Sequence, residues 1–411
     1  MYRELEICNY LTRYKTQNFY EGSMIKATAC AGAAVIAALY GAPTFANADT
    51  ITDYEVINAP AMKAAKASKA VLTEITQTDN YTVAVGDYGV VLYRAAGQNE
   101  WQQADVPTSV LFTSVDFVDA DHGWAVGHHG VIAATKDGGK SWEVQLNGFE
   151  FIELQQQHFQ NVVDELTAEL DSLDGSDADA EDELAFALDN ASFLLEMAQA
   201  ADAEGPTKPF LDVRAVSQDV IFAVGAYGTL IRSRDGGESW DILDDRLENP
   251  DGYHLNALSS DDQYVYVAGE AGQLFRSADL GDSWELLDSP YYGSFFGLHV
   301  DSKNRLWVVG LRGNIFVSDD QGDSFNQIKL PDNVNINSVV DAPNGGVYLV
   351  GNAGVIGWVD TAGNIKQMTH SSGAALTDLV AHDDGRLTVV GQRGVLEIAD
   401  FESESSAQTQ E

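Results

Sequence analysis

Three groups of residues have the types and spacing that chemistry would require. His128 and His129 are adjacent imidazoles that could offer nitrogen ligands to a metal. Asp177, Asp179 and Glu181 are alternating carboxylates, as in the first half of a calcium loop. Aspartates also recur in the pattern S/T-x-D-x-G-x-S/T-W/F, at Asp137, Asp235, Asp279 and Asp320, with downstream Gly139, Gly237, Gly281 and Gly322.

None of these groups predicts a reactive centre. Adjacent histidines in a tight turn do not both face one ion, so His128 and His129 are expected to be exposed turn residues. Asp182 stands where a calcium loop needs glycine, which favours a solvated acidic turn. The recurring aspartates lie on separate repeats and cannot converge on one substrate, so they are expected to shape turns. We therefore expect no catalytic residue, no metal and no cofactor: the protein is predicted not to be an enzyme.

The elements that position these residues are repeats. A G-x-x-G element occurs seven times, and most successive first glycines are 40 to 44 residues apart. Short alternating strands at this period are typical of β-propeller blades. One interval, of 98 residues, is a normal repeat that carries an insertion. The seven elements are Gly86/Gly89, Gly127/Gly130, Gly225/Gly228, Gly269/Gly272, Gly310/Gly313, Gly351/Gly354 and Gly391/Gly394.

Each blade is expected to contain four antiparallel strands, A to D, with G-x-x-G as the tight B–C turn, where glycine permits a positive φ. The seventh repeat lacks a D strand before its polar end. We expect "DYEVIN", residues 53–58, to supply that strand and close the ring. The predicted fold class is all-β: a seven-bladed β-propeller with an α-helical hairpin inserted between blades two and three.

The aspartate motif is the Asp-box, or bacterial neuraminidase repeat. With "GWAVG" ahead of the box, the whole pattern resembles the photosystem II assembly and stability factors of the Ycf48/HCF136 type, whose proteobacterial relatives carry the same repeat. The resemblance covers about residues 53–400 apart from the insertion. It implies a propeller that acts as an assembly factor and uses a basic arginine patch to engage newly made reaction-centre protein. Arg232 and Arg276 match part of such a patch.

The enzyme alternative is a sialidase-like glycoside hydrolase, or a lectin, on the same scaffold. A sialidase needs an arginine triad and a nucleophile pair. Arg232 and Arg276 occupy equal positions on two blades, but the other blades carry different residue types there. This alternative would need a convergent polar cluster in the central funnel.

The variable rim is the expected recognition surface. The middle residues of the G-x-x-G turns differ in every blade, and a fixed frame with variable aromatic and cationic residues suits binding. The candidate partner-binding residues are Tyr88, His128, His129, Tyr227, Arg232, Arg276, Arg312 and Arg393.

The insertion, residues 149–209, has apolar residues at helical spacing and contains no Lys or Arg before Lys208. It is expected to form an acidic helical hairpin. Because D–A loops and B–C turns emerge on one face of a propeller, the hairpin should stand beside the G-x-x-G rim. It is either a docking arm for a basic or helical partner or a solvated hairpin that packs locally.

The net charge and the N-terminal sequence limit the partners and the cellular location that the protein is expected to have. The chain has 23 Lys plus Arg against 63 Asp plus Glu, which excludes nucleic acid and anionic lipid as partners. From Met24, one of two candidate starts, the sequence reads as a signal peptide cleaved near Asp49. Both cysteines, Cys8 and Cys30, precede that point.

The expected organisation is a leader (1–48), a closing strand with blades one and two (49–148), the hairpin (149–209), blades three to seven (210–400) and a polar tail (401–411). We expect a monomeric, exported, periplasmic or lumenal binding and assembly factor. Its client is a membrane protein complex or an unassembled subunit, with photosystem II implied by resemblance. An accessory role for an envelope transporter stays open.

Overall fold

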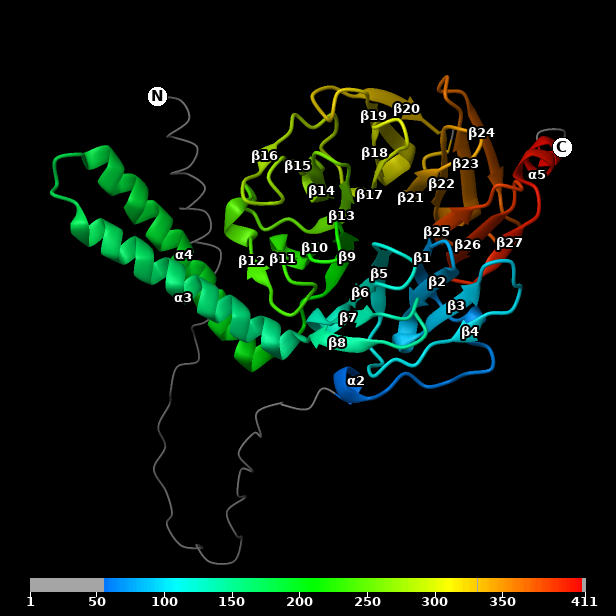
Figure 1. Cartoon of the computed structure of the whole chain (residues 1–411). Coiled ribbons are helices and arrows are strands. Elements are labelled where there is room, and N and C mark those ends of the chain that lie inside the picture. The colour runs from blue at the N-terminus through cyan, green and yellow to red at the C-terminus, as the bar shows by residue number, and fades with distance from the viewer. Residues whose placement is uncertain (1–54, 331, 409–411) are drawn as a thin grey trace, which may run out of the picture. The chain divides into compact units, whose positions relative to one another are not determined.

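The computed structural model describes residues 55–330 and 332–408. The predicted leader, its cleavage site and both cysteines therefore lie outside the described residues. Among the described residues there are six four-stranded antiparallel sheets and one three-stranded sheet, each built from consecutive strands. The sheets are arranged around a central axis, and each innermost strand contacts the innermost strand of the next sheet (Figure 1). The seven-bladed β-propeller is confirmed.

Blades one to three follow the predicted strand order. The first contains β1 (Leu72–Gln77), β2 (Tyr81–Gly86), β3 (Val91–Ala95) and β4 (Gln102–Gln103). The second contains β5 (Phe112–Phe117), β6 (Gly123–Gly127), β7 (Ile132–Thr135) and β8 (Glu143–Leu146). The third contains β9 (Phe210–Ala215), β10 (Ile221–Gly225), β11 (Leu230–Ser233) and β12 (Asp241–Ile242).

The remaining blades repeat this plan. Blade four contains β13 (Leu255–Ser260), β14 (Val265–Gly269), β15 (Leu274–Ser277) and β16 (Glu285–Leu286). Blade five contains β17 (Phe295–Val300), β18 (Leu306–Gly310), β19 (Asn314–Ser318) and β20 (Asn326–Lys329). Blade six contains β21 (Ile336–Asp341), β22 (Val347–Gly351), β23 (Val355–Val359) and β24 (Ile365–Thr369). Blade seven contains β25 (Leu376–Ala381), β26 (Leu387–Gly391) and β27 (Leu396–Ile398).

The core lies between blades rather than at the centre of the ring. The second strands are continuously buried, as in Val265–Gly269, because both of their faces pack against neighbouring sheets. Aromatic residues fill the same interfaces: Phe222 of blade three meets Trp284 of blade four edge-to-face, with ring centroids 6.2 Å apart. Trp142 packs in the same way against Phe117 in its own blade.

The predicted closing strand is wrong. Residues 55–58 form a short helix, α2 (Glu55–Asn58), and the Ala59 amide donates to the Glu55 carbonyl. Ile57 is buried in the cluster shared by blades one and two, on the side of blade one that does not face blade seven. Within the described residues, blade seven keeps three strands.

The expected polar tail also has structure. It forms α5 (Phe401–Gln408), which contacts β24 of blade six. Phe401 is buried and meets Tyr348 edge-to-face, with ring centroids 5.3 Å apart. Ser405 is also buried, and Glu402 pairs with Lys366 of β24, so this mostly polar segment is held against blade six by several contacts.

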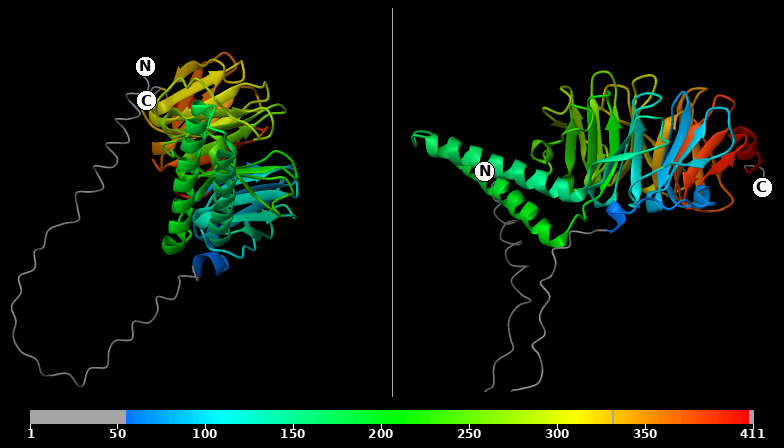
Figure 2. Two further views of the ribbon diagram at one scale, coloured as in Figure 1. Left: turned by 90° about the vertical axis from the view of Figure 1, so that its left-hand side faces the viewer. Right: turned by 60° about the horizontal axis from the view of Figure 1, so that its bottom comes forward.

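The predicted hairpin is present as α3 (Gly148–Ser172) and α4 (Ala178–Glu204). Asn147 caps α3 by accepting from the amides of Phe149 and Glu150, and Glu150 returns a bond to the Asn147 amide. The base of the hairpin lies beside the blade-two G-x-x-G turn, as expected. From this base the helices extend outward past blade three (Figure 2). Among the described residues, none of the helices has both the length and the apolar character to span a bilayer.

Candidate partner-binding surface

The G-x-x-G turns have the predicted positive φ at their second glycine, for example 68° at Gly89 and 81° at Gly272, but the other positions add features that were not predicted. The first glycine is extended, with φ of −152° at Gly269, for example. In six of the seven turns the third residue, which is not glycine, takes the left-handed conformation, as in Tyr88 (φ 56°) and Arg312 (φ 59°). The third residue is exposed in five of the seven turns and half-buried in the other two, at His129 and Ala271.

The first glycine is required for a different reason. A Cβ built on Gly269 would lie 2.4 Å from the His254 carbonyl oxygen, which precedes the innermost strand of the same blade. The same clash, at 2.2 Å, meets Gly310 at the Ser294 carbonyl oxygen. The repeated first glycine therefore allows close backbone approach rather than an unusual φ.

Five of the eight predicted partner-binding residues are exposed on this face. Tyr88 and Tyr227 are 72% and 65% exposed, and His128, Arg312 and Arg393 are also exposed. The structure adds Tyr292, in the loop between β16 and β17 on the same face, which is 91% exposed. Sequence reasoning missed Tyr292 because this loop lies outside the repeated motif.

His129 makes a contact within the protein and is only partly exposed on the rim. Its Nδ1 lies 2.9 Å from the Pro206 carbonyl oxygen, so the ring links the blade-two turn to the end of the hairpin. Burial, followed by the neighbouring His129, lowers the pKa of His128. Among the described residues no group of three or more His, Cys, Asp or Glu is arranged to hold a metal.

Arg232 and Arg276 lie on the opposite face, where they connect neighbouring blades. Arg232 is 2% exposed, and its guanidinium donates to the Leu280 carbonyl and to Asp282 of the next Asp-box. Arg276 repeats this contact with the Gln321 carbonyl and Asp323, both at 2.9 Å. The structure therefore does not join these two arginines to the exposed rim.

The Asp-box aspartates shape their own turns. Asp279 accepts from the Ser283 amide at 2.9 Å and from the Ser283 and Ser277 hydroxyls at 2.7 and 2.8 Å. The Ser283 hydroxyl lowers the pKa of Asp279 to about 2. Both carboxylate oxygens of Asp279 thus accept hydrogen bonds from residues of its own turn.

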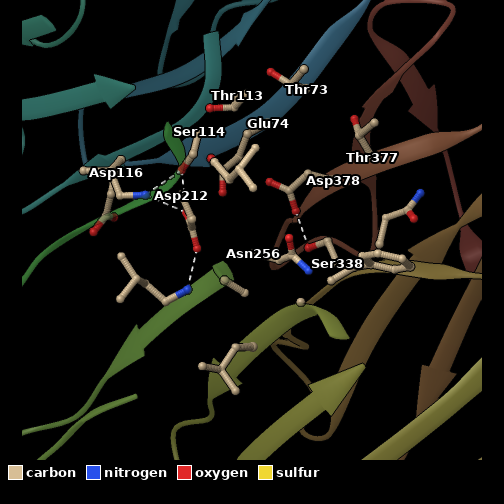
Figure 3. Close-up of a pocket in the computed structure, with 18 of the residues that line it drawn as sticks. Thr73, Glu74, Thr113, Ser114, Asp116, Asp212, Asn256, Ser338, Thr377 and Asp378 are labelled. Atoms are coloured by element: carbon tan, nitrogen blue, oxygen red, sulfur yellow. Dashed lines mark hydrogen bonds between the residues drawn. The ribbon is translucent and has the colours of Figure 1, made fainter. Parts of the chain in front are cut away.

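A polar channel in the middle of the ring was not predicted. Its cavity of about 310 Å³ is lined by the innermost strands of all seven blades. Glu74, Asp212 and Asp378 occupy the same position on three of these strands and project into the channel (Figure 3). An alignment of the seven innermost strands, which shows a polar third residue recurring, would have found them.

These carboxylates join one blade to the next. Glu74 accepts from the Val115 amide at 2.6 Å, and Asp212 accepts from the Leu258 amide at 2.6 Å. Burial raises the pKa of Asp212 to about 6, and burial together with Asp212 and Asp378 raises the pKa of Glu74. The channel carboxylates therefore hydrogen-bond neighbouring blades to each other inside the ring, and their burial favours the protonated form.

The channel does not have the composition that a sialidase needs. Of the residues that line it, Arg214 alone is an arginine, whereas carboxylate recognition in that reaction requires three. The Arg214 side chain donates to Ser260 and Asp116. The convergent polar cluster required by the hydrolase alternative is present, but its groups are bonded to the scaffold.

Comparison with known proteins supports the resemblance. A family model described as "Photosynthesis system II assembly factor YCF48" matches residues 93–165 and 201–291. The photosystem II assembly protein Ycf48 of Thermosynechococcus vestitus is 37% identical over 49 residues, which cover 12% of this chain and 14% of that protein. The chloroplastic stability/assembly factor HCF136 of Cyanidioschyzon merolae is 37% identical over 67 residues, 15% of either chain. These alignments thus span a small part of the curated relatives.

The solved structure described as YCF48 bound to D1 peptide extends the comparison to the whole ring. It matches with a TM-score of 0.54 and 16% identity, over 80% of this chain and 93% of that one. At this identity the likeness establishes the fold. The sequence and structural matches together confirm the resemblance predicted from the glycine pairs and Asp-boxes: the chain is a β-propeller that is similar to Ycf48.

Proposed function

We propose that this protein is an exported, non-enzymatic binding factor that engages a subunit of a membrane protein complex during assembly. The family resemblance makes a photosystem II subunit the first client to test. The observation that carries the proposal is the exposed G-x-x-G face, where Tyr88, Tyr227, Tyr292, Arg312 and Arg393 extend from a rigid ring. Aromatic and arginine side chains are the types that most often anchor protein interfaces.

The remaining charged groups support binding rather than catalysis. Arg232 and Arg276 are bonded to neighbouring blades, and the channel carboxylates accept from backbone amides. A reactive group needs a free lone pair or proton directed at a substrate. These groups instead hold the ring that displays the rim.

The proposal includes export to the periplasmic or lumenal side. It is supported by the signal-peptide pattern that follows Met24. Amino-terminal sequencing of the protein from its native host tests this part. A mature start near Asp49 is expected, and a chain that retains residues 24–48 would contradict cleavage.

The binding test is a crosslinked pull-down from the native host. We expect the wild type to recover a membrane protein subunit and a Tyr88→Ser/Arg312→Ser/Arg393→Ser variant to lose most of it. A matched variant on the other face, Lys303→Ser/Arg386→Ser, should recover as much as the wild type. These two residues lie in turns between first and second strands, opposite the rim.

Each outcome of the pull-down supports or excludes one of the proposed functions. A photosystem II subunit would establish the client implied by resemblance, and an envelope transporter would establish the alternative client. Equal recovery by the rim variant would reject this face as the binding surface. If no protein is recovered, the assembly role is wrong and a glycan array becomes the next assay.

A further inference from the structure

The outer half of the hairpin is incompletely covered. Near the base, Phe151 and Phe159 are each 2% exposed because they pack against blades two and three. Farther out, Val162, Leu166 and Leu170 of α3 are only half-buried. In a hairpin of two helices each helix covers only part of the apolar surface of the other, and the rest of that surface stays in contact with water.

The outward face of α4 is also apolar. Phe186, Phe193 and Met197 are 70%, 57% and 52% exposed. Their spacing of seven and four residues places them on one stripe of the helix. Ala191 and Ala198 are buried on the opposite side of α4. We call Phe186, Phe193 and Met197 the α4 stripe.

Acidic residues border the α4 stripe. Asp182, Asp189 and Glu196 fall at neighbouring helical positions and are all exposed. There is no Lys or Arg between Lys140 and Lys208, so no cation of the hairpin itself neutralises them. An apolar stripe with acidic residues along one edge is complementary to an amphipathic helix whose apolar face is bordered by Lys or Arg.

We propose that the α4 stripe binds a basic amphipathic helix of the client protein. This inference rests on the proposed binding function and assigns a second contact within it. The client helix would pack on α4 as a third helix of the arm. It would cover the α4 stripe and place its cations beside Asp182, Asp189 and Glu196. The hairpin starts beside the G-x-x-G rim, so a client held by the rim could extend such a helix along the arm.

The test is calorimetric titration of the purified protein with synthetic 18-residue peptides. The probe is a helix of Leu and Lys with the leucines on one face. One control peptide has the same composition in an order without helical periodicity, and another replaces Lys by Glu. We expect only the first peptide to bind with micromolar affinity.

Variants locate the binding site. Phe186→Ser/Phe193→Ser/Met197→Ser should weaken binding at least tenfold, whereas Tyr88→Ser/Tyr292→Ser, which removes exposed aromatics on the rim, should leave it unchanged. Asp182→Asn/Asp189→Asn/Glu196→Gln keeps the stripe and should weaken binding while reducing its salt dependence. Unchanged helical circular dichroism must accompany each variant, and the charge variant serves as the test if the stripe variant loses helix.

Contrary results are distinct. Equal binding by the stripe variant, or by the non-periodic peptide, would show general attraction to an acidic surface and overturn the proposal. Absence of binding by the Leu/Lys helix would also overturn it. In both cases the pull-down with rim variants still decides the proposed function, because those variants leave α4 untouched.

Discussion

Asp378 of the last blade accepts a hydrogen bond from the backbone amide of Ile75 in the first blade, at 3.0 Å. Beside it, the Thr377 hydroxyl donates to the Leu72 carbonyl at 3.0 Å. At the outer side of this junction, the largely buried Arg94 pairs with Glu397 at 2.7 Å. Side chains of the first and last blades therefore hold the ring closed, and Asp378 does so by the same kind of contact that Glu74 and Asp212 make at other blade junctions.

Removal of the Asp378 acceptor should destabilise the closed ring. In Asp378→Ala the Ile75 amide loses its acceptor in a buried position, and the Ser338 hydroxyl loses one as well. We expect the free energy of unfolding in urea to fall by about 2–3 kcal/mol. Asp383→Ala changes an exposed carboxylate close by and should alter stability by less than about 0.5 kcal/mol. A similar loss in both variants would reject the closing role of Asp378.

Protons should stabilise the folded ring. Burial raises the pKa of both Asp212 and Asp378 to about 6, above the value of an unfolded aspartate near 4. The folded state therefore binds more protons than the unfolded state between these values, and its stability falls as pH rises through about 6. We expect the unfolding free energy to be about 2 kcal/mol higher at pH 5 than at pH 7.5. Urea titrations at both pH values measure this difference.

Asp378→Asn distinguishes two causes of the pH-dependent stability: titration of the channel carboxylates and repulsion among the acidic residues of the surface. The amide oxygen can still accept from Ile75 but has no proton to lose. The variant should match the wild type at pH 5 and exceed it by about 1 kcal/mol at pH 7.5. His299 and Glu74 act on the same titration, since His299 lowers the pKa of Asp378 and Asp378 raises that of Glu74. An unchanged pH slope in the variant would assign the effect to surface charge.

Arg232 should matter for stability and not for client capture. Its buried guanidinium holds the next Asp-box through the Leu280 carbonyl and Asp282. We expect Arg232→Ala to lower the unfolding free energy by about 3 kcal/mol, because the buried Leu280 contact and the ion pairs are lost together. Arg393→Ala, on the exposed rim, should leave stability unchanged and reduce pull-down of the client. The reverse pattern would return Arg232 to the binding surface.

Local sequence patterns predicted the strands and helices, but not the contacts between distant segments. The glycine pairs, Asp-boxes and alternating strands mark blades because each pattern is complete within about 40 residues. In contrast, "DYEVIN" alternates like a strand, and only burial of Ile57 against blades one and two selects the helix. Six residues carry too little periodicity to decide between these structures.

The channel and the arginine contacts could not be predicted from the sequence for the same reason. Asp378 and Ile75 are 303 positions apart, so a polar residue in this strand reads as solvent-facing until the ring is closed. Arg232 similarly reads as a free cation, because its partner Asp282 belongs to the next blade. The exposed rim residues Tyr88, Tyr227 and Arg312 could be predicted because tight turns lie at the surface. The burial of Ala226 and the contact of His129 with Pro206 could not, because both depend on segments outside the turn.

The first and third positions of a G-x-x-G turn, Gly269 and Ala271 in blade four, should respond differently to substitution. Gly269→Ala places a Cβ 2.4 Å from the His254 carbonyl oxygen, although its extended backbone suits any residue. Ala271 has a φ of 53°, where alanine is strained by roughly 1 kcal/mol. We expect Gly269→Ala to lower the unfolding free energy by about 2–4 kcal/mol and Ala271→Gly to leave it unchanged or raise it slightly, as measured by urea unfolding. If Gly269→Ala were tolerated, the close approach of strands would not explain the repeated first glycine, and a role in recognition would have to be tested at that position.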